Sequence, residues 1–213
     1  MEYIDDVTVK AMSGMKLSRL GNRLSDKGLA GFEFAIGIPG TIGGAVRMNA
    51  GAYGGEIKDI IVSAEVLDQN GDIHTLGKDE LELGYRTSSI MKYGYIVVSA
   101  TLKLSKGNTD EIKENIKELS QKRRMKQPLE YPSAGSTFKR PEGYFAAKLI
   151  EDAGLKGLSA GDAQVSEKHA GFVVNKGRAT AKDVCELTDK IKEEVLKKSG
   201  VKLELEVVKI GEF

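Results

Sequence analysis

The stretch from Ala35 to Glu56 constrains the fold of this 213-residue chain more than any other. It reads AIGIPGTIGGAVRMNAGAYGGE, and nine of the 28 residues from Gly28 to Gly55 are glycine. Glycine in a helix or strand costs about 0.5–1 kcal/mol relative to alanine, so we expect this run to lie outside regular elements. Its bare backbone amides could surround an anion or the edge of a flat ring system, which suggests a cofactor. An irregular, well-packed crossover between elements is the alternative interpretation.

Composition excludes several classes of function. The formal net charge of +1 argues against a nucleic-acid partner, which usually requires a clearly basic face. No apolar run approaches the roughly 20 residues of a membrane span, and the first ten residues do not resemble a signal peptide. Cys185 is the only cysteine and there are two histidines, so we expect neither a disulfide nor a metal site. These features predict a cytoplasmic protein with no membrane partner, and leave its oligomeric state open.

Apolar periodicity and turn signals predict the elements of the first half. They are a strand over 7–11, a helix from Leu17 ending at Gly28, a hairpin of strands 60–67 and 73–76, a helical patch over 78–83 and a strand over 95–104. The second half is richer in helix. It holds predicted helices from Asn108, over 144–153 and from Thr180 to Gly200, and strands over 162–165, 171–175 and 201–210. The change in character predicts an α+β chain with a boundary near Ser105.

Three residues are candidates for chemistry. Arg86 lies in a Gly-Tyr-Arg-Thr-Ser loop, where its planar guanidinium suits a carboxylate or phosphate, although a solvated arginine is the alternative. Ser136 lies in Ala-Gly-Ser-Thr-Phe, where serine usually caps or turns, and no neighbouring histidine could activate it as a nucleophile. Glu206 falls on the polar side of the predicted last strand and, taken alone, indicates a solvated strand face. Tyr53 and Tyr85 could be core or site-lining residues.

Four sequence blocks closely resemble the UDP-N-acetylenolpyruvoylglucosamine reductase family. They are Gly37–Glu56, Tyr85–Ser88, Pro132–Pro141 and Leu203–Val207, and they occur in the order found in the family. Ala146–Leu155 and His169–Asn175 are also similar to the family. The resemblance covers essentially the whole chain. The link before Ser133 lacks an inserted tyrosine-bearing loop, as in the shorter of the two subclasses of the family.

The resemblance implies an FAD- and NADPH-dependent reductase of peptidoglycan precursor synthesis. The family reduces the enolpyruvyl ether of UDP-N-acetylglucosamine to the lactyl ether of UDP-N-acetylmuramate. The implied fold is the remainder of a two-part, mostly antiparallel FAD-binding lobe over residues 1–105. An α/β substrate-binding lobe follows over residues 106–213, and its C-terminal strand carries Glu206.

The resemblance also implies a role for each matching residue. Arg86 would stabilise the carboxylate of the reacting group, Ser136 would protonate the neighbouring carbon, and Glu206 would assist at the same centre. The expected FAD contacts are Ile38, Pro39, Gly40, Thr41, Gly43, Gly44, Asn49, Gly51 and Tyr53. The expected contacts to the UDP-sugar substrate are Tyr85, Lys126, Lys139 and Arg140.

One departure from the family affects the cofactor. The family has an amino-terminal FAD-binding segment ahead of the position of Met1, with a glycine-containing turn for the flavin diphosphate. We therefore expect an N-terminally truncated form that binds FAD weakly or not at all, which a yellow purified sample with stoichiometric flavin would contradict. Two other hypotheses remain open. One is a related flavin oxidoreductase with another substrate, and the other is a non-catalytic nucleotide-sugar-binding fragment without flavin.

Overall fold

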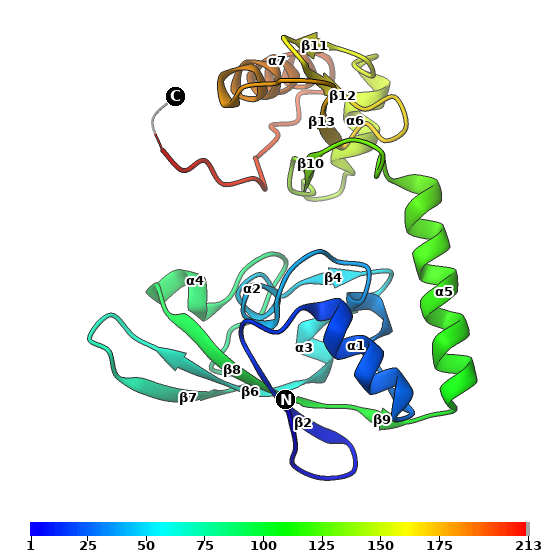
Figure 1. Ribbon diagram of the computed structural model, residues 1–213. Helices are drawn as coiled ribbons and strands as arrows, with labels where there is room; N and C mark the ends of the chain where they lie inside the picture. The colour runs from blue at the N-terminus through cyan, green and yellow to red at the C-terminus, as the bar shows by residue number, and fades with distance from the viewer. Residues whose placement is uncertain (212–213) are drawn as a thin grey trace. The chain divides into compact units, whose positions relative to one another are not determined.

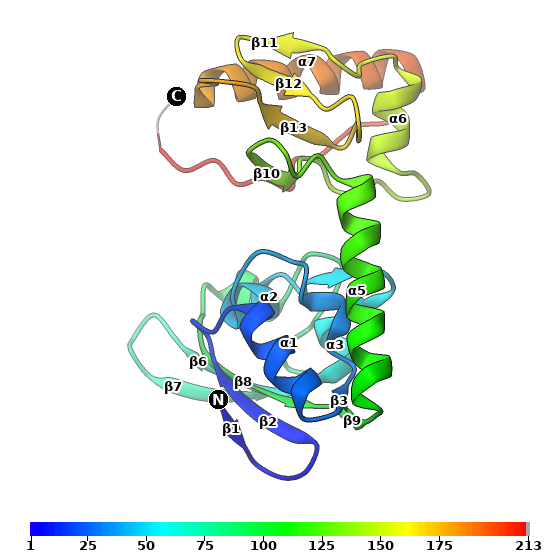
Figure 2. The ribbon, with the colours of Figure 1, turned by 45° about the vertical axis from the view of Figure 1, so that its right-hand side comes forward.

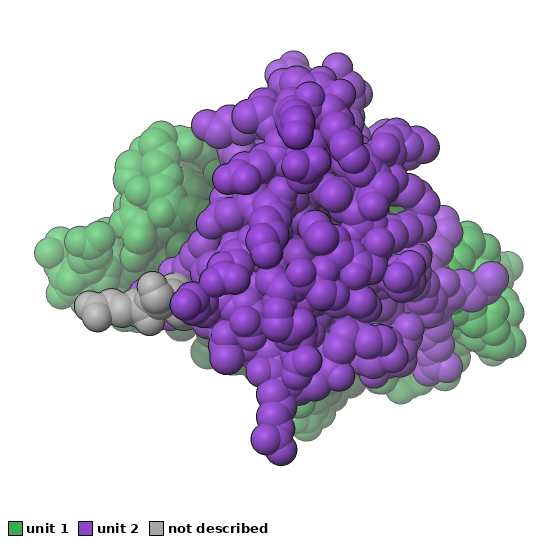
Figure 3. Space-filling model, turned by 90° about the horizontal axis from the view of Figure 1, so that it is seen from above, with its two compact units in different colours: residues 1–123 green, residues 124–213 purple. Residues whose placement is uncertain are grey.

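The structure is a computed structural model that describes residues 1–211. The chain forms two compact units, residues 1–123 and residues 124–213, which are coloured separately in Figure 3. Each unit has its own cluster of buried apolar side chains. Within the described part of the chain, no helix has the length and apolar character needed to cross a membrane.

Unit 1 is built on a five-stranded antiparallel sheet. Its strand order is β1 (Glu2–Tyr3), β2 (Thr8–Met12), β8 (Ile96–Lys103), β6 (Ile61–Leu67) and β7 (Ile73–Gly77). The predicted hairpin is present as β6 and β7, with Leu67 opposite Ile73 on either side of the Asn70–Gly71 turn. The predicted first strand is present as β2, which pairs with β8 on one side and with β1 on the other.

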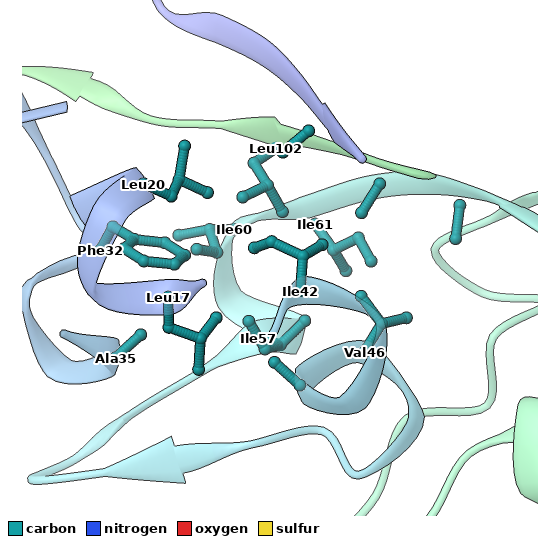
Figure 4. Packing of buried hydrophobic residues seen from close by; sticks show 14 of the residues in the cluster. Leu17, Leu20, Phe32, Ala35, Ile42, Val46, Ile57, Ile60, Ile61 and Leu102 are labelled. Carbon is teal, nitrogen blue, oxygen red and sulfur yellow. The ribbon is translucent and has the colours of Figure 1, made fainter. Parts of the chain in front are cut away.

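Three helices cover one face of this sheet (Figures 1 and 2): α1 (Leu17–Asp26), α2 (Ile42–Arg47) and α3 (Ile57–Ile60). Leu17, Leu20 and Leu24 of α1 are buried, as their spacing predicts, and Gly28 follows the helix with a left-handed φ of 66°. Figure 4 shows the first two of these leucines packed with residues of α2, α3 and β8. Burying a leucine or isoleucine side chain stabilises the fold by about 1.5–3 kcal/mol, so this layer holds the glycine-rich run in place.

The glycine-rich run is more regular than the sequence predicts. It contains a 3-10 turn η1 (Glu33–Ala35), the helix α2, and the short hairpin of β4 (Gly51–Ala52) and β5 (Gly55–Glu56). The helix forms despite two glycines because Ile42, Ala45 and Val46 are buried against the core. The predicted helical patch over 78–83 is wrong, since this segment consists of turns and leads to α4 (Ser89–Tyr93).

The boundary between the units lies at Arg123, further along the chain than the expected position at Ser105. The long helix α5 (Thr109–Lys126) begins where predicted, because Asn108 Oδ1 accepts hydrogen bonds from the backbone N–H groups of Asp110 and Glu111. Its early turns belong to unit 1. The short strand β9 (Ser105–Lys106) pairs with β3 (Leu29–Ala30), Ile112 is buried, and Lys113 pairs with Asp26 at 2.8 Å.

Unit 2 contains a four-stranded antiparallel sheet and two helices. The strand order is β10 (Ser133–Ser136), β13 (Phe172–Asn175), β12 (Ala163–Val165) and β11 (Ser159–Ala160). α6 (Ala146–Asp152) and α7 (Ala181–Ser199) complete the unit, and α7 packs against β11 and β12. As predicted, this helix begins after Thr180 and ends at Gly200, which has a φ of 71°. Thr180 and Asp183 form a capping box at its start.

The predicted last strand over 201–210 is wrong. This segment makes one isolated antiparallel bridge, between Leu205 and Phe138. The backbone N–H of Glu206 donates to the carbonyl of Thr137 at 2.9 Å, and the N–H of Lys139 donates to the carbonyl of Glu204 at 2.9 Å. Pairing is confined to these neighbours because β10 has already ended at Ser136. The α+β fold class is confirmed, since helices accompany sheets that are antiparallel throughout the described strands.

Candidate active site

The glycine-rich run of unit 1 is held at its first bend by backbone pairing. The N–H of Leu17 donates to the carbonyl of Gly40 at 3.1 Å, and the N–H of Ile42 donates to the carbonyl of Met15 at 2.9 Å. Pro39 and Gly40 are exposed at this bend, whereas Ile38 packs against the core. The bend is therefore a fixed surface feature.

The next glycines differ in what surrounds them. A Cβ at Gly43 would lie 2.9 Å from the Cβ of Ser13, so this glycine is required by close packing. A Cβ at Gly40, Gly44 or Gly54 would meet no atom within 4 Å. Bare backbone with open space above it can accommodate a flat ring or a phosphate, so this part of the run fits a cofactor such as FAD.

Two of the predicted cofactor contacts, Asn49 and Gly51, also make close contacts within the protein. Asn49 is fully buried, and its Nδ2 donates to Glu56 Oε2 at 2.7 Å and to the carbonyl of Gly84 at 3.1 Å. Its Oδ1 accepts from the N–H of Lys58 at 2.9 Å. A Cβ at Gly51 would lie 2.8 Å from the carbonyl oxygen of Gly55, so glycine is required by the β4–β5 hairpin. Through these internal contacts, Asn49 and Gly51 fix the conformation of the β4–β5 hairpin.

Backbone strain is concentrated at this site. Four described non-glycine residues have left-handed φ values: Asn49 (42°), Tyr53 (53°), Glu82 (44°) and Arg86 (53°). A left-handed conformation costs an ordinary residue roughly 1–2 kcal/mol. Two of the four are connected through neighbouring segments, because Asn49 Nδ2 donates to the carbonyl of Gly84, in the turn that carries Arg86, and Arg86 Nη2 donates to the carbonyl of Gly51 at 3.3 Å. Strained residues that the surroundings hold in place often mark a functional site.

Arg86 is presented on a tight turn. Gly84 and Thr87 pair across it, and the Arg86 guanidinium lies 5.1 Å from the centre of the exposed Tyr85 ring. Just after the turn, Ser88 caps α4 and its hydroxyl donates to the carbonyl of Arg47 at 2.6 Å. The turn is thus attached both to the glycine-rich run and to the end of α2.

Arg123 is a further basic residue at this site that the sequence did not single out. Its Cδ lies 3.2 Å from the position that a Cβ of Gly37 would occupy. Burial lowers the pKa of Arg123, and neighbouring Tyr53 acts in the opposite direction. Arg123 lies near the C-terminal end of α5, so only the fold shows that it reaches Gly37.

In unit 2 the structure brings Ser136 and Glu206 together. Ser136 ends β10, is exposed, and its hydroxyl donates to the carbonyl of Phe138 at 3.3 Å. Glu206 is partly buried, and its N–H bonds the carbonyl of Thr137, the residue after Ser136. Two residues far apart in sequence thereby share one edge of the unit.

Two of the predicted substrate-binding cations, Lys139 and Arg140, follow this edge along the chain, and the third, Lys126, belongs to the same unit. Lys139 follows Phe138, and its Nζ lies 3.5 Å from Glu204 Oε2. The Arg140 guanidinium lies 4.5 Å from the centre of the exposed Phe145 ring. Lys126 is exposed at the end of α5.

His169 is a second residue near this edge that the sequence did not single out for chemistry. Its Nδ1 accepts a hydrogen bond from the N–H of Gly171 at 3.1 Å, and the carbonyl of Gly171 accepts from the N–H of Thr137 at 2.9 Å. Burial lowers the pKa of His169. The neutral ring, protonated on Nε2, therefore suits this site.

Comparison with known proteins agrees with this division of the chain. Residues 1–77 match the FAD binding domain family, and residues 127–210 match the family described as UDP-N-acetylenolpyruvoylglucosamine reductase, C-terminal domain. The UDP-N-acetylenolpyruvoylglucosamine reductase of Clostridium tetani is 58% identical over 209 residues, which are 98% of this chain and 68% of that protein. The chain belongs to the UDP-N-acetylenolpyruvoylglucosamine reductase family.

Other members of the reductase family give the same result. The protein of that name from Lachnoclostridium phytofermentans is 61% identical over 200 residues, which are 94% of this chain and 64% of the relative. The crystal structure of UDP-N-acetylenolpyruvylglucosamine reductase from Thermus caldophilus superposes with a TM-score of 0.82 at 39% identity, covering 94% of this chain and 71% of that one. The predicted family and the FAD cofactor are thus confirmed. This chain spans about two thirds of the length of the curated relatives.

Proposed function

We propose that this chain catalyses the NADPH- and FAD-dependent reduction of UDP-N-acetylglucosamine enolpyruvate to UDP-N-acetylmuramate, in cytoplasmic peptidoglycan precursor synthesis. One observation carries the proposal. Arg86 is held in a strained conformation against Gly51, within the unit that contains the match to the FAD binding domain family. Reduction of the enolpyruvyl double bond places negative charge on the attached carboxylate, and a cation fixed beside the cofactor site would stabilise that charge.

The open glycines indicate how the cofactor would be held. Gly40, Gly44 and Gly54 would leave room for FAD, Tyr53 and Pro39 would line it, and Arg123 would supply a positive charge to its anionic groups. Bound FAD supplies the hydride, which it receives from NADPH. Asn49 and Gly51 would act on the site from within, by fixing the hairpin on which it is built.

Arg86 would stabilise the charge that develops during the reaction. When hydride adds to the vinyl carbon distal to the carboxylate, the electron pair of the double bond moves to the neighbouring carbon and is shared with the carboxylate. A guanidinium already oriented toward that carboxylate lowers the barrier without reorganising, an effect of about 3–4 kcal/mol for one preorganised donor. Tyr85, stacked against Arg86, would help to orient it.

Ser136 would complete the reduction by protonating the carbanionic carbon. Its O–H bond breaks, the new C–H bond forms, and solvent restores the proton to the hydroxyl. The hydroxyl donates to Phe138 in the structure, so it would rotate toward the substrate to perform this step. Glu206, on the segment that bonds the backbone of Thr137, would assist this proton transfer from Ser136. Lys126, Lys139 and Arg140 would contact the anionic UDP-sugar.

The test is to supply the chain with FAD, NADPH and the enolpyruvyl UDP-sugar, and to identify the product by mass spectrometry. In D₂O we expect deuterium on the carbon next to the carboxylate, because the exchangeable hydroxyl of Ser136 delivers that proton, while the added hydride stays unlabelled. Binding of the UDP-sugar without NADPH oxidation would contradict the proposal and favour a non-catalytic nucleotide-sugar-binding role. Turnover of a different substrate alone would favour another flavin oxidoreductase.

A further inference from the structure

Asn49 connects the glycine-rich run to the turn that carries Arg86. Its Nδ2 bonds Glu56 on one side and the carbonyl of Gly84 on the other. Glu56 lies opposite Gly51 in the β4–β5 hairpin, and the carbonyl of Gly51 accepts the bond from Arg86 Nη2. Since Gly84 and Arg86 belong to one turn, these contacts form a closed ring, here called the Asn49 ring.

The chemistry of the ring requires an amide at this position. Asn49 uses two N–H donors and one acceptor, and it does so fully buried, where an unsatisfied polar group costs about 1–3 kcal/mol. A carboxylate would offer no donor and would face the carboxylate of Glu56, which also pairs with Lys58 Nζ at 2.6 Å. Asparagine also tolerates the φ of 42° better than most residues.

We propose that Asn49 is a positioning residue for Arg86. It acts through the turn and the hairpin, and it sets where the guanidinium stands without itself touching the cofactor or the substrate. The role rests on the proposed function, because it matters for catalysis only if Arg86 stabilises the reacting carboxylate. The sequence placed Asn49 among the cofactor contacts, and its three internal hydrogen bonds point to this different role.

The positioning can be measured on the chain itself by limited trypsin digestion. Trypsin cleaves after Arg86 only when the turn opens, and cleavage after Arg23 in α1 reports the opening of the rest of unit 1. The variant Asn49→Gly removes the side chain and keeps a residue that accepts a left-handed φ. We expect the ratio of cleavage after Arg86 to cleavage after Arg23 to rise roughly tenfold, as for the loss of one or two hydrogen bonds.

Glu82→Gly is the matched control. Glu82 has a similar left-handed φ of 44° and lies just before the same turn, but its ion pair with Lys92 is exposed and outside the Asn49 ring. We expect its cleavage ratio to match that of the unaltered chain. Equal ratios for Asn49→Gly and the unaltered chain would overturn the proposal.

The variant Asn49→Asp supplies a signature that loss of folding cannot imitate. At neutral pH its carboxylate faces that of Glu56 and the turn should open, whereas at lower pH one proton shared by the two carboxyl groups restores a donor between them. The cleavage ratio should therefore fall toward normal as the pH is lowered, with the Arg23 reference cancelling the pH dependence of trypsin. A ratio that does not change with pH would contradict the role assigned to the Nδ2–Glu56 bond.

Turnover by the FAD-loaded chain then links position to catalysis. We expect Asn49→Gly to lower kcat for the enolpyruvyl substrate roughly 10²-fold, as for a misplaced catalytic group, with the KM for NADPH unchanged. Turnover that remains normal while the turn opens would refute the catalytic part of the proposal. If the unaltered chain itself fails to reduce the substrate, the proposed function fails, while the trypsin result still decides whether Asn49 positions Arg86.

Discussion

Substitution by alanine at Gly43 and at Gly44, two neighbouring residues of α2, should change the Tm in opposite directions. Gly44 lies inside the helix, and a Cβ there would meet no atom within 4 Å. Replacing glycine by alanine in a helix interior stabilises it by about 0.5–1 kcal/mol. In a domain the size of unit 1 this corresponds to a rise in Tm of roughly 2–6 °C.

Gly43→Ala supplies the matched comparison, since it changes the same helix by the same methyl group. The new Cβ would lie 2.9 Å from Ser13 Cβ and 3.4 Å from its carbonyl oxygen, which accepts the Gly43 N–H. Ser13 cannot move away without breaking that bond. Overpacking of this kind costs about 1–3 kcal/mol, which exceeds the gain in helix propensity, so Gly43→Ala should lower the Tm.

FAD should reduce the stability advantage of Gly44→Ala over the unaltered chain. Bound FAD raises the Tm of a protein that binds it in the folded state by mass action. Because the methyl group occupies the space assigned to the cofactor, the increase in Tm caused by FAD should be smaller in Gly44→Ala than in the unaltered chain. Thermal unfolding followed by circular dichroism, with and without FAD, measures both effects. An increase caused by FAD that is measurable and equal in the two proteins would refute the assignment of this surface, and a lowered Tm of Gly44→Ala without FAD would refute the packing argument.

Two further predictions concern unit 2. Because the pKa of His169 is depressed below its ordinary 6.5, the unfolded state binds more protons, and the stability of unit 2 should fall as the pH drops from above 6.5 toward the folded pKa. His169→Asn keeps an acceptor for the Gly171 N–H but does not titrate. Chemical denaturation at several pH values should therefore show a weaker pH dependence of the free energy of unfolding in this variant. An unchanged pH dependence would contradict the attribution to His169. Thr180→Ala removes the capping-box acceptor of α7 and should lower the free energy of unfolding by about 1 kcal/mol, whereas Thr180→Ser should stay close to normal.

The sequence predicted those elements that are specified by interactions between residues close together in the chain. The leucine spacing of α1, the Asn70–Gly71 turn and the capping box at Thr180 each specify their element with nearby residues. Helix α2 was missed because glycine propensity opposes it and burial of Ile42 and Val46 overrides that propensity. The last strand was overpredicted because the alternation after Val201 is real, but few partner residues are present beside it.

The candidate site shows the same limit. The family resemblance indicated Arg86, Ser136 and Glu206, and within unit 2 the structure brings Ser136 and Glu206 together. The sequence could not show that Asn49 faces inward, or that Arg123 reaches Gly37, because both facts depend on contacts between segments distant in the chain. The position of the unit boundary likewise depends on how the early turns of α5 pack.

The role of Ser136 tests the proposed mechanism most directly, by rapid-mixing measurement of the two half-reactions of the FAD-loaded chain. In Ser136→Ala we expect reduction of the flavin by NADPH to stay near normal, because the hydroxyl takes no part in it. Reoxidation by the enolpyruvyl UDP-sugar should slow by at least the roughly 10²–10⁴-fold that a general acid contributes. An equal loss in both half-reactions, or unimpaired reoxidation, would contradict the assignment of Ser136 as the proton donor.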